Sequence, residues 1–280
     1  MTLDVVVPAV RTATLSRLLW SLAQGSIRPD MVSVVSNEVD GEVETHGLEV
    51  RVLLFSSERY PFGAYDLALR RNVGIFYSAC SHVVTFDDDQ IAPRTMLAAV
   101  RGLLEDRPYV WGHHRYASFA RFSPEALIDR APRAGRTREH PPNAWHLWQS
   151  CYGGMFAAER ALLERLGGFD MIFSGRQAGE DQNLGRRIAR AVDGRERVFI
   201  HEPPFAWHPE ENEAWPATSL TNLCSGSHQL GDEVIGDVRV RRCRSCPYLV
   251  ADDYDSKLFG DEPVLPFDAG LVEVTINGLD

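Results

Sequence analysis

Apolar and polar positions divide the first hundred residues into blocks with two alternating periodicities. Four short apolar runs, rich in β-branched residues, have the length of buried strands: residues 3–10, 31–36, 48–55 and 82–86. Between them, apolar side chains recur at helical spacing over residues 12–25, 63–80 and 93–106. Such alternation predicts an α/β fold, with a Rossmann-like, mostly parallel central sheet and helices on both faces.

The pattern weakens in the second half of the chain. Residues 129–145 contain four arginines and three prolines and are expected to form a loop. Further on, we expect strands at 150–158 and 197–200 and helices at 159–168 and 180–192. The last 70 residues look irregular. Proline is generally tolerated at the first position of a helix. The helix predicted over residues 93–106, in the first half of the chain, is therefore expected to begin at Pro93.

Composition narrows the possible classes of protein. The net charge is −10 and the pI about 5.4, whereas a nucleic-acid-binding protein usually has a basic balance. No signal peptide is visible in the first residues, and no apolar run approaches the roughly 18 to 20 residues that a membrane helix needs. We therefore expect a cytoplasmic protein, which is compatible with peripheral contact with a membrane surface.

Three consecutive aspartates, Asp87, Asp88 and Asp89, follow the fourth predicted strand directly. In open parallel sheets, ligands bind at the carboxyl ends of the strands. Carboxylates gathered there suit a hard divalent cation such as Mg²⁺ or Mn²⁺, whose charge offsets their mutual repulsion. The alternative is a solvated acidic turn that caps the following helix.

With these aspartates, several other motifs appear in one order: "RRNVGI" before them, and "GGMF", "GGFD", "GED" and "WHPE" after them. In this order the chain resembles the family 2 glycosyltransferases of GT-A fold, over residues 3–209. Each motif alone is weak, but the ordered set is specific. The resemblance implies a GT-A domain over 1–210, with a nucleotide-sugar-binding half over about 1–110 and an acceptor half over about 111–210. Residues 211–280 would form a C-terminal extension.

The resemblance also implies roles for individual residues. Asp89 would coordinate Mn²⁺ or Mg²⁺ on the donor diphosphate, while Asp87 and Asp88 would hold the ribose or assist the metal. The late His208 would complete the metal site. Arg71 and Asn72 match the Arg-Asn motif near the donor nucleotide. The alternatives are a solvated surface arginine for Arg71 and an ordinary half-buried histidine for His208.

On the acceptor side, the resemblance makes Asp181 the general base, with Glu180 beside it. Both residues fall in the first turn of a predicted helix, where the helix dipole favours an ionised carboxylate. A carboxylate within reach of the acceptor hydroxyl can take its proton. The alternative is an ordinary acidic residue in the first turn of a helix. The Arg-rich loop over 129–145 could close over the donor diphosphate as a lid or remain a solvated loop.

One departure from the family concerns the nucleotide. Family members often carry aspartates after the second strand that help to read uracil, whereas this chain has Ser36, Asn37 and Glu38. Asn37 and Glu38 remain candidates for contact with a base edge. A UDP-sugar donor is expected first, with GDP- and dTDP-sugars as alternatives.

Four residues near the end of the chain form a candidate metal-binding motif: Cys224 and His228, then Cys243 and Cys246. Three thiols and an imidazole in two close pairs match the ligands of a tetrahedral structural zinc site. A redox pair or unrelated cysteines are the alternatives. Zinc would tie down the extension and take no part in sugar transfer.

Together these features predict a metal-dependent inverting glycosyltransferase that moves a sugar from a nucleotide diphosphate sugar to an acceptor hydroxyl or amine. The acceptor, whether a carbohydrate, a lipid-linked sugar or a small molecule, stays open. A non-catalytic GT-A-like protein that binds glycans or partners is one alternative. A sugar nucleotidyltransferase is another, although the Gly-rich phosphate loop that such an enzyme normally carries near its first strand is missing.

Overall fold

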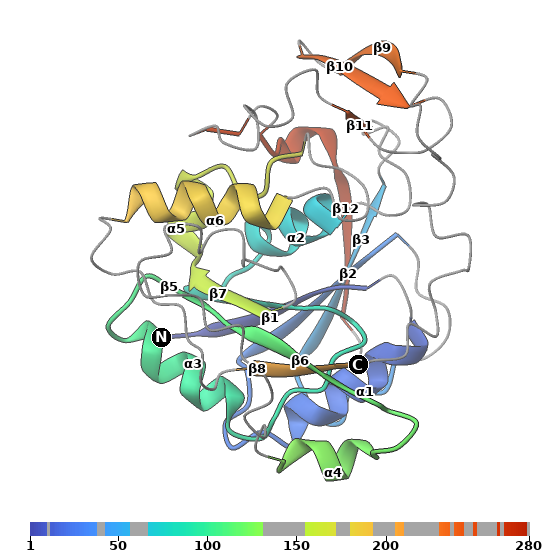
Figure 1. Ribbon diagram of the computed structural model, residues 1–280, viewed down its shortest axis with the longest axis vertical. Helices are drawn as coiled ribbons and strands as arrows, with labels where there is room; N and C mark the ends of the chain where they lie inside the picture. Colours follow the sequence, from blue (N-terminus) through green and yellow to red (C-terminus); the bar gives the residue numbers. More distant parts are fainter. Residues whose placement is uncertain are drawn as a thin grey trace.

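Four parallel strands form the middle of a seven-stranded mixed sheet in the computed structural model (Figure 1). The structure describes residues 1–9, 12–37, 43–56, 67–130, 155–171, 180–192, 205–209, 230–235, 238–243, 249–250, 262–263 and 266–278. The parallel strands are β3 (Val50–Ser56), β2 (Met31–Ser36), β1 (Leu3–Pro8) and β4 (His82–Phe86), in that spatial order. They match the four strands expected from the sequence, and they confirm the α/β prediction.

Antiparallel strands extend the sheet on both sides of this parallel core. Strand β7 (Met155–Glu159) pairs with β4, and β5 (Tyr109–Trp111) pairs with β7. On the other side, β12 (Glu273–Gly278) pairs with β3 along its whole length. The order across the sheet is therefore β12-β3-β2-β1-β4-β7-β5.

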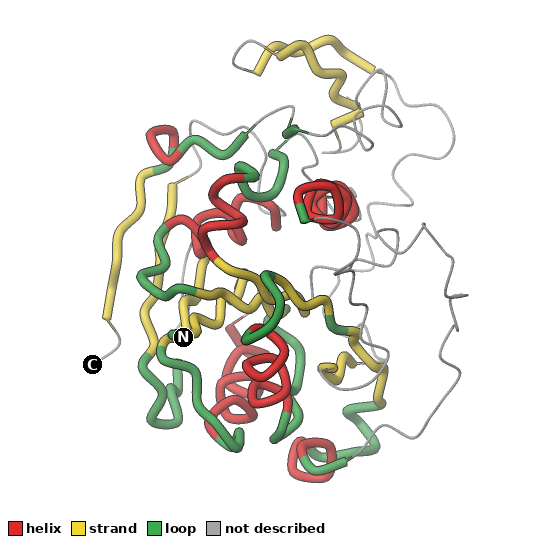
Figure 2. The backbone as a smooth tube through the Cα atoms, turned by 90° about the vertical axis from the view of Figure 1, so that its left-hand side faces the viewer, coloured by secondary structure: helices red, strands yellow, loops and turns green. Residues whose placement is uncertain are grey.

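Helices cover both faces of the sheet, as Figures 1 and 2 show. One face carries α2 (Leu67–Phe76), α5 (Arg160–Arg165) and α6 (Glu180–Ala191). The opposite face carries α1 (Thr12–Ala23) and α3 (Met96–Leu104), with the short α4 (Pro124–Ile128) beyond them. Among the described residues, no helix is long and apolar enough to cross a membrane.

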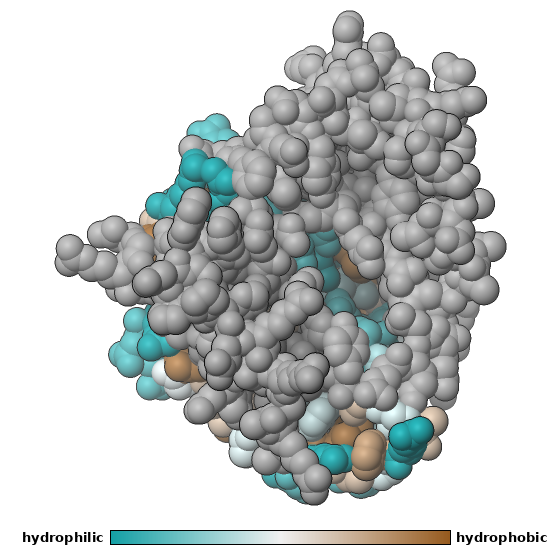
Figure 3. All heavy atoms as spheres, viewed as in Figure 1, coloured by the Kyte–Doolittle hydropathy of each residue, from teal (hydrophilic) through white to brown (hydrophobic). Residues whose placement is uncertain are grey.

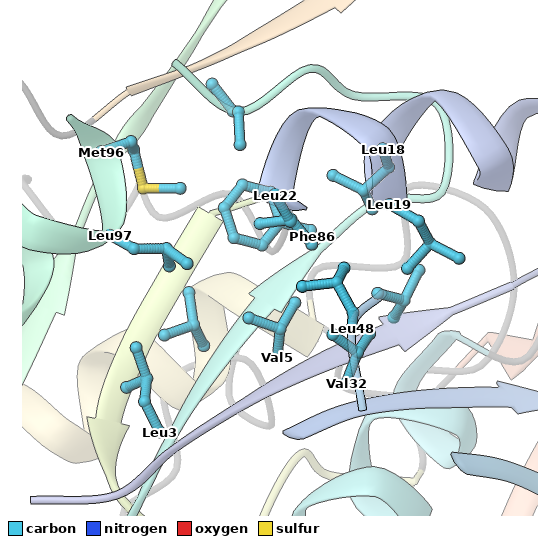
Figure 4. Packing of buried hydrophobic residues seen from close by; sticks show 14 of the residues in the cluster. Leu3, Val5, Leu18, Leu19, Leu22, Val32, Leu48, Phe86, Met96 and Leu97 are labelled. Atoms are coloured by element: carbon cyan, nitrogen blue, oxygen red, sulfur yellow. The ribbon is translucent and has the colours of Figure 1, made fainter. Parts of the chain in front are cut away.

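Strand periodicity distributes the apolar side chains between two cores. In β1, Val5 and Val7 face α1 and α3, whereas Val6 faces α2. Neighbouring strands repeat this alternation, so each face of the sheet presents a continuous apolar surface. Figure 4 shows the α1/α3 side, where Leu18 and Leu22 of α1 and the side chains of α3 pack over the strands.

A close approach between α2 and β1 fixes the position of this helix. Gly74 lies over Val6, and a Cβ atom at this position would overlap one γ-methyl of Val6 and lie 3.0 Å from the other. The glycine therefore lets the helix backbone contact the strand. This contact matters for the site because Arg70, Arg71 and Asn72 lie in the same helix.

A buried polar cluster crosses the amino ends of the parallel strands. The Asp4 carboxylate of β1 accepts hydrogen bonds from Ser33 Oγ of β2 at 2.8 Å, Arg51 Nη2 of β3 at 2.9 Å and Ser78 Oγ at 2.7 Å. Burial raises the pKa of Asp4, and the hydrogen bond from Ser78 and the charge of Arg51 oppose this effect. Ser78 follows α2, which ends at Phe76, four residues before the expected Cys80; here Ser78 N donates to Ile75 O, three residues back, and the helical pattern stops.

Two other expectations need correction. The third helix begins at Met96, not Pro93, because Arg94 N donates to Ile128 O and Met96 N to Pro93 O in a turn before the helix. The expectation that the last 70 residues are irregular is wrong for two regions. Residues 273–278 form β12 in the main sheet, and residues 230–235, 238–243 and 249–250 form a small antiparallel sheet. The division at residue 210 stays a prediction, although the sheet takes an edge strand from beyond it. The strand expected at 197–200 lies outside the described residues.

Two smaller sheets complete the described structure. Strand β6 (His113–Ala117) pairs in parallel with β8 (Phe205–Pro209). Strands β9 (Leu230–Ile235), β10 (Val238–Cys243) and β11 (Leu249–Val250) form an antiparallel sheet within the predicted extension. A short 3₁₀ turn, η3 (Ala269–Leu271), precedes β12.

Candidate active site

The three aspartates form a closed turn at the carboxyl end of β4. Gln90 N donates to Asp87 O at 3.3 Å, and Gln90 Oε1 accepts from Asp87 N at 3.3 Å. Asp88 and Asp89 are buried, whereas the Asp87 side chain is 28 % exposed. The turn therefore directs Asp87 and Asp89 to different surroundings, although they are only two residues apart.

Arg71 of α2 links this turn to the predicted acceptor side. Its Nη2 donates to Asp87 Oδ1 at 3.2 Å, and its Nη1 donates to Glu180 Oε1 at 3.0 Å. The arginine is only 3 % exposed, and its guanidinium lies 5.4 Å from the centre of the Phe169 ring. Burial lowers the pKa of Arg71, but the carboxylates of Asp87, Glu180 and Asp181 outweigh burial and raise it overall.

Glu180 and Asp181 are the first two residues of α6, as the sequence predicts. Burial raises the pKa of Glu180 to about 7, and the neighbouring charge of Asp181 adds to this effect. The charge of Arg71 acts in the opposite direction. The pair therefore combines a buried carboxyl group, which is held by an arginine, with a second carboxylate at the positive end of a helix.

Strand β8 brings His208 to the aspartate turn. Trp207 and Ile91 exchange backbone hydrogen bonds of 2.8 and 2.9 Å, and Trp207 Nε1 donates to Leu127 O at 3.0 Å. These bonds anchor β8 beside the residues that follow the turn. His208 Nε2 consequently lies 3.5 Å from Asp89 Oδ1, although the two residues are distant in sequence.

Asn72 has a different environment from its neighbour Arg71. It is fully buried, donates to Phe169 O at 2.8 Å and accepts from Phe169 N at 2.7 Å. Gly168 has a φ of +69°, and a Cβ atom there would overlap Asn72 Oδ1. Asn72 thus holds the backbone of the "GGFD" segment. Its predicted role near the nucleotide stays a prediction.

Arg187 of α6 secures the same segment from the other side. It is 1 % exposed and donates to Leu166 O at 2.6 Å, to Gly168 O at 2.7 Å and to Asn183 Oδ1 at 2.8 Å. Burial lowers its pKa to about 10, against the opposing charge of Asp170. Arg187 was not predicted as a site residue, because two adjacent arginines in a helix are typical of a solvated face.

Arg70 lies at the carboxyl ends of β1 and β2 and was also missed. Its Nη1 donates to Ala9 O at 2.7 Å and to Val35 O at 3.4 Å, and its Nη2 donates to Asn37 Oδ1. Its guanidinium also lies 5.3 Å from the centre of the ring of Phe55, a residue of β3. Arg70 therefore orients Asn37, whose backbone directly follows β2.

Other predicted residues lie wholly or partly outside the described structure. Glu38, Cys224, His228 and Cys246 are among them, as is residue 131 onward of the Arg-rich loop. Cys243 ends β10, but its side chain is not described. Within the described ranges, no group of three or more His, Cys, Asp or Glu side chains is arranged to hold a metal ion.

Described hydrophilic residues are visible in a hollow near the middle of the face in Figure 3.

The raised pKa of Glu180 predicts a pH-dependent contribution to stability. The folded protein holds this proton up to about pH 7, whereas the unfolded chain releases it near the ordinary value of 4.5. The stability contributed by Glu180 is therefore present below pH 4.5 and is lost as the pH rises through 7. Urea denaturation between pH 4 and 8 should show Glu180→Gln gaining free energy of unfolding relative to the native protein as the pH increases.

Glu105→Gln, which alters an exposed glutamate after α3, is the matched control. Its difference from the native protein should stay constant over the same range. The Arg71 ion pair forms only with ionised Glu180, so its effect is already part of the folded-state pKa of Glu180 and does not reverse the trend. A pH-independent difference for Glu180→Gln would contradict the pKa assignment.

No protein-family model matches the sequence, and no similar sequence is found among curated proteins. Solved structures do resemble it. Residues 1–349 of S. aureus TarS in complex with UDP match with a TM-score of 0.55 and 14 % identity, over 75 % of this chain and 60 % of that one. The corresponding complex with UDP-GlcNAc has a TM-score of 0.53, with 15 % identity over 75 % and 59 % of the two chains.

The mannosyltransferase PcManGT from Pyrobaculum calidifontis, in complex with GDP-Man and Mn²⁺, matches with a TM-score of 0.51. Its identity is 21 %, over 79 % of this chain and 60 % of that chain. The chain thus spans about 60 % of the length of the structures that it matches. At these identities the likeness concerns the fold: a mixed, largely parallel seven-stranded sheet in the arrangement of the GT-A glycosyltransferases.

Proposed function

We propose that this chain is a metal-dependent inverting glycosyltransferase that uses a nucleotide diphosphate sugar as donor and a hydroxyl or amine as acceptor. One observation carries the proposal: Arg71 joins the aspartate turn after β4 to the carboxylate pair that begins α6. On a GT-A sheet, these are the donor and acceptor sides of a sugar-transfer site. The similar structures are complexes with UDP, with UDP-GlcNAc and with GDP-Man, which supports a nucleotide-sugar ligand.

The pair formed by Asp89 and His208 fits a divalent cation. His208 Nδ1 lies 3.1 Å from Pro209 O, and because a carbonyl can only accept, Nδ1 is the donor. In the neutral imidazole, Nε2 then points a lone pair toward Asp89 Oδ1, 3.5 Å away. Two acceptors that face each other are stabilised by a cation between them. The Mn²⁺ in the PcManGT structure is consistent with this chemistry.

Two protein ligands are few, so the donor diphosphate would supply most of the remaining oxygen ligands. Once bound, the metal would neutralise the charge that gathers on the departing nucleoside diphosphate. In this proposal the partly exposed Asp87, together with Asp88, holds the ribose or assists at the metal. These residues define the donor side of the proposed site.

Asp181 is the proposed general base. It is the second residue of α6, where the helix dipole favours the ionised form, and the positive charge of Arg71 acts in the same sense. Glu180 is held by Arg71 and retains its proton more readily than an ordinary glutamate. The two carboxyl groups thus have different roles: Asp181 accepts the proton of the acceptor, and Glu180 anchors the helix start. A single base opposite the leaving group gives inversion.

Asn37 supports a preference among nucleobases. Because Arg70 donates to Asn37 Oδ1, the carbonyl oxygen of the amide points toward the arginine. The NH₂ group, which can only donate, is left for other partners. At the carboxyl end of β2, beside β1, a doubly wound fold receives the nucleoside part of its ligand. Uracil and thymine carry a carbonyl acceptor at C4 and guanine carries one at C6, whereas cytosine and adenine carry an amino group at these positions.

The extension is proposed to bind zinc independently of this site. Cys243 ends β10 in register with Leu230, the first residue of β9. His228 precedes Leu230 by two positions and Cys246 follows Cys243 by three, so both candidates are close along the chain to this end of the small sheet.

Protein purified without added zinc is expected to contain about one zinc ion per chain. Metal analysis checks this, and folded protein without zinc would refute it.

Nucleotide binding should depend on the base and on the metal. With Mn²⁺, UDP, GDP and dTDP are expected to raise the melting temperature more than CDP and ADP, since ligands that bind the folded state stabilise it. Asn37→Ala should reduce this difference between bases. Asp89→Ala should remove the part of the shift that requires Mn²⁺, whereas Asp106→Asn, an exposed control, should keep it. Equal shifts for all five nucleotides would contradict the role of Asn37.

Turnover should depend on Asp181. Asp181→Asn is expected to bind nucleotide normally and to lose on the order of 10² to 10⁴ in rate, because the amide cannot accept the proton. Sugar transfer, or slow hydrolysis of the nucleotide sugar with Mn²⁺, measures this loss beside Asp106→Asn. Full activity in Asp181→Asn would exclude it as the base. Nucleotide shifts without turnover in the native protein would favour the non-catalytic binding protein instead.

A further inference from the structure

Arg71 is placed between the two sides of the proposed site, and its described hydrogen bonds both go to carboxylates. One terminal nitrogen bonds Asp87, sixteen residues later in the chain, and the other bonds Glu180, 109 residues later. The side chain is almost completely buried. Such a group is poorly placed to bind a nucleotide directly, which is the role that the family resemblance implies for it.

We propose that Arg71 is a positioning residue that holds the first turn of α6, and with it Asp181, in register with the aspartate turn after β4. This inference rests on the proposed function, because it concerns the alignment of the base with the donor. It assigns Arg71 to the geometry of the reaction and leaves nucleotide recognition to Asp87, Asp88 and Asn37.

The surroundings of Arg71 hold it rigidly enough for this role. Its helix is fixed on β1 by the close approach at Gly74, and the next residue, Asn72, is bonded to both backbone groups of Phe169. The Phe169 ring lies beside the guanidinium. A planar guanidinium can direct two nitrogens to two carboxylates at once, whereas the ammonium of lysine is a single point charge.

Charge gives the same arrangement a second effect. The charged groups that act on Glu180 among the described residues are Arg71 from α2 and Asp181 on α6, with Asp87 on the far side of the guanidinium. The cation favours the ionised form of Glu180. Without it, the buried Glu180 would adjoin Asp181 with no described cation to offset the two effects that raise its pKa, and the pKa of Glu180 would rise further.

The first test separates positioning from nucleotide binding by steady-state kinetics. Arg71→Met should lower kcat on the order of 10²-fold, the effect of a displacement of about 1 Å in the reacting groups, with little change in the KM for the donor. Its acid limb of kcat/KM should move to higher pH. Arg71→Lys should recover part of kcat, and Arg165→Met, at an exposed position in α5, should match the native protein.

A variant Arg71→Met with raised donor KM and unchanged kcat would overturn the proposal, since uniform loss of binding indicates a direct nucleotide contact. An unaltered pH profile with a large fall in kcat would also overturn it, because the charge would then have no influence on the acids. Should Arg71→Met fail to fold, the same comparisons are made between Arg71→Lys and the native protein.

The second test needs no turnover and separates failure of this inference from failure of the proposed function. A double-mutant cycle of Asp87→Asn and Glu180→Gln measures, by urea denaturation, the coupling between two side chains that contact each other through Arg71. Coupling is expected in the native background and should be lost in the Arg71→Met or Arg71→Lys background. Coupling that persists without Arg71, or its absence in the native background, refutes positioning. Intact coupling in a protein without transfer activity refutes only the proposed function.

Discussion

Acidic side chains that gather at one edge of a sheet must be balanced by a cation that the fold itself holds. Asp87 and Glu180 come from elements far apart in the sequence, and Arg71 is the group that both contact. The position of Arg71 depends in turn on how α2 packs on β1, where Gly74 permits the approach. Packing of one helix on one strand therefore places the positive charge that Asp87 and Glu180 share.

Local patterns in the sequence were sufficient to predict the central strands and the helices on their two faces. They were also sufficient to place acidic residues after the end of β4 and at the start of α6. These features follow from side-chain periodicity and from where a strand or helix stops. The position of the aspartates after β4 then indicated a ligand site, because the carboxyl ends of parallel strands meet at one edge of the sheet. Asp87 and Glu180 could be proposed as site residues before any tertiary contact was known.

Features that depend on rotation about a helix, or on pairing between distant segments, could not be predicted. Arg70 and Arg71 are adjacent and identical, yet one contacts Asn37 and the other Glu180, because successive residues in a helix point about 100° apart. The burial of Asn72 and Arg187 reflects contacts with the backbone near Phe169, which no local pattern reveals. The sequence of β12 does not predict a strand by itself, and its strand structure becomes apparent only from its pairing with β3.

Strand β12 has a consequence for how the protein is made. Its partner β3 is complete by Ser56, whereas β12 begins at Glu273, so a ribosome must translate more than two hundred residues between them. During that interval, β3 would present an open edge to other nascent chains, and unpaired edges promote aggregation. Elongation rate and chaperone supply should therefore affect the yield of correctly folded protein more strongly than they would if the sheet were completed early in synthesis.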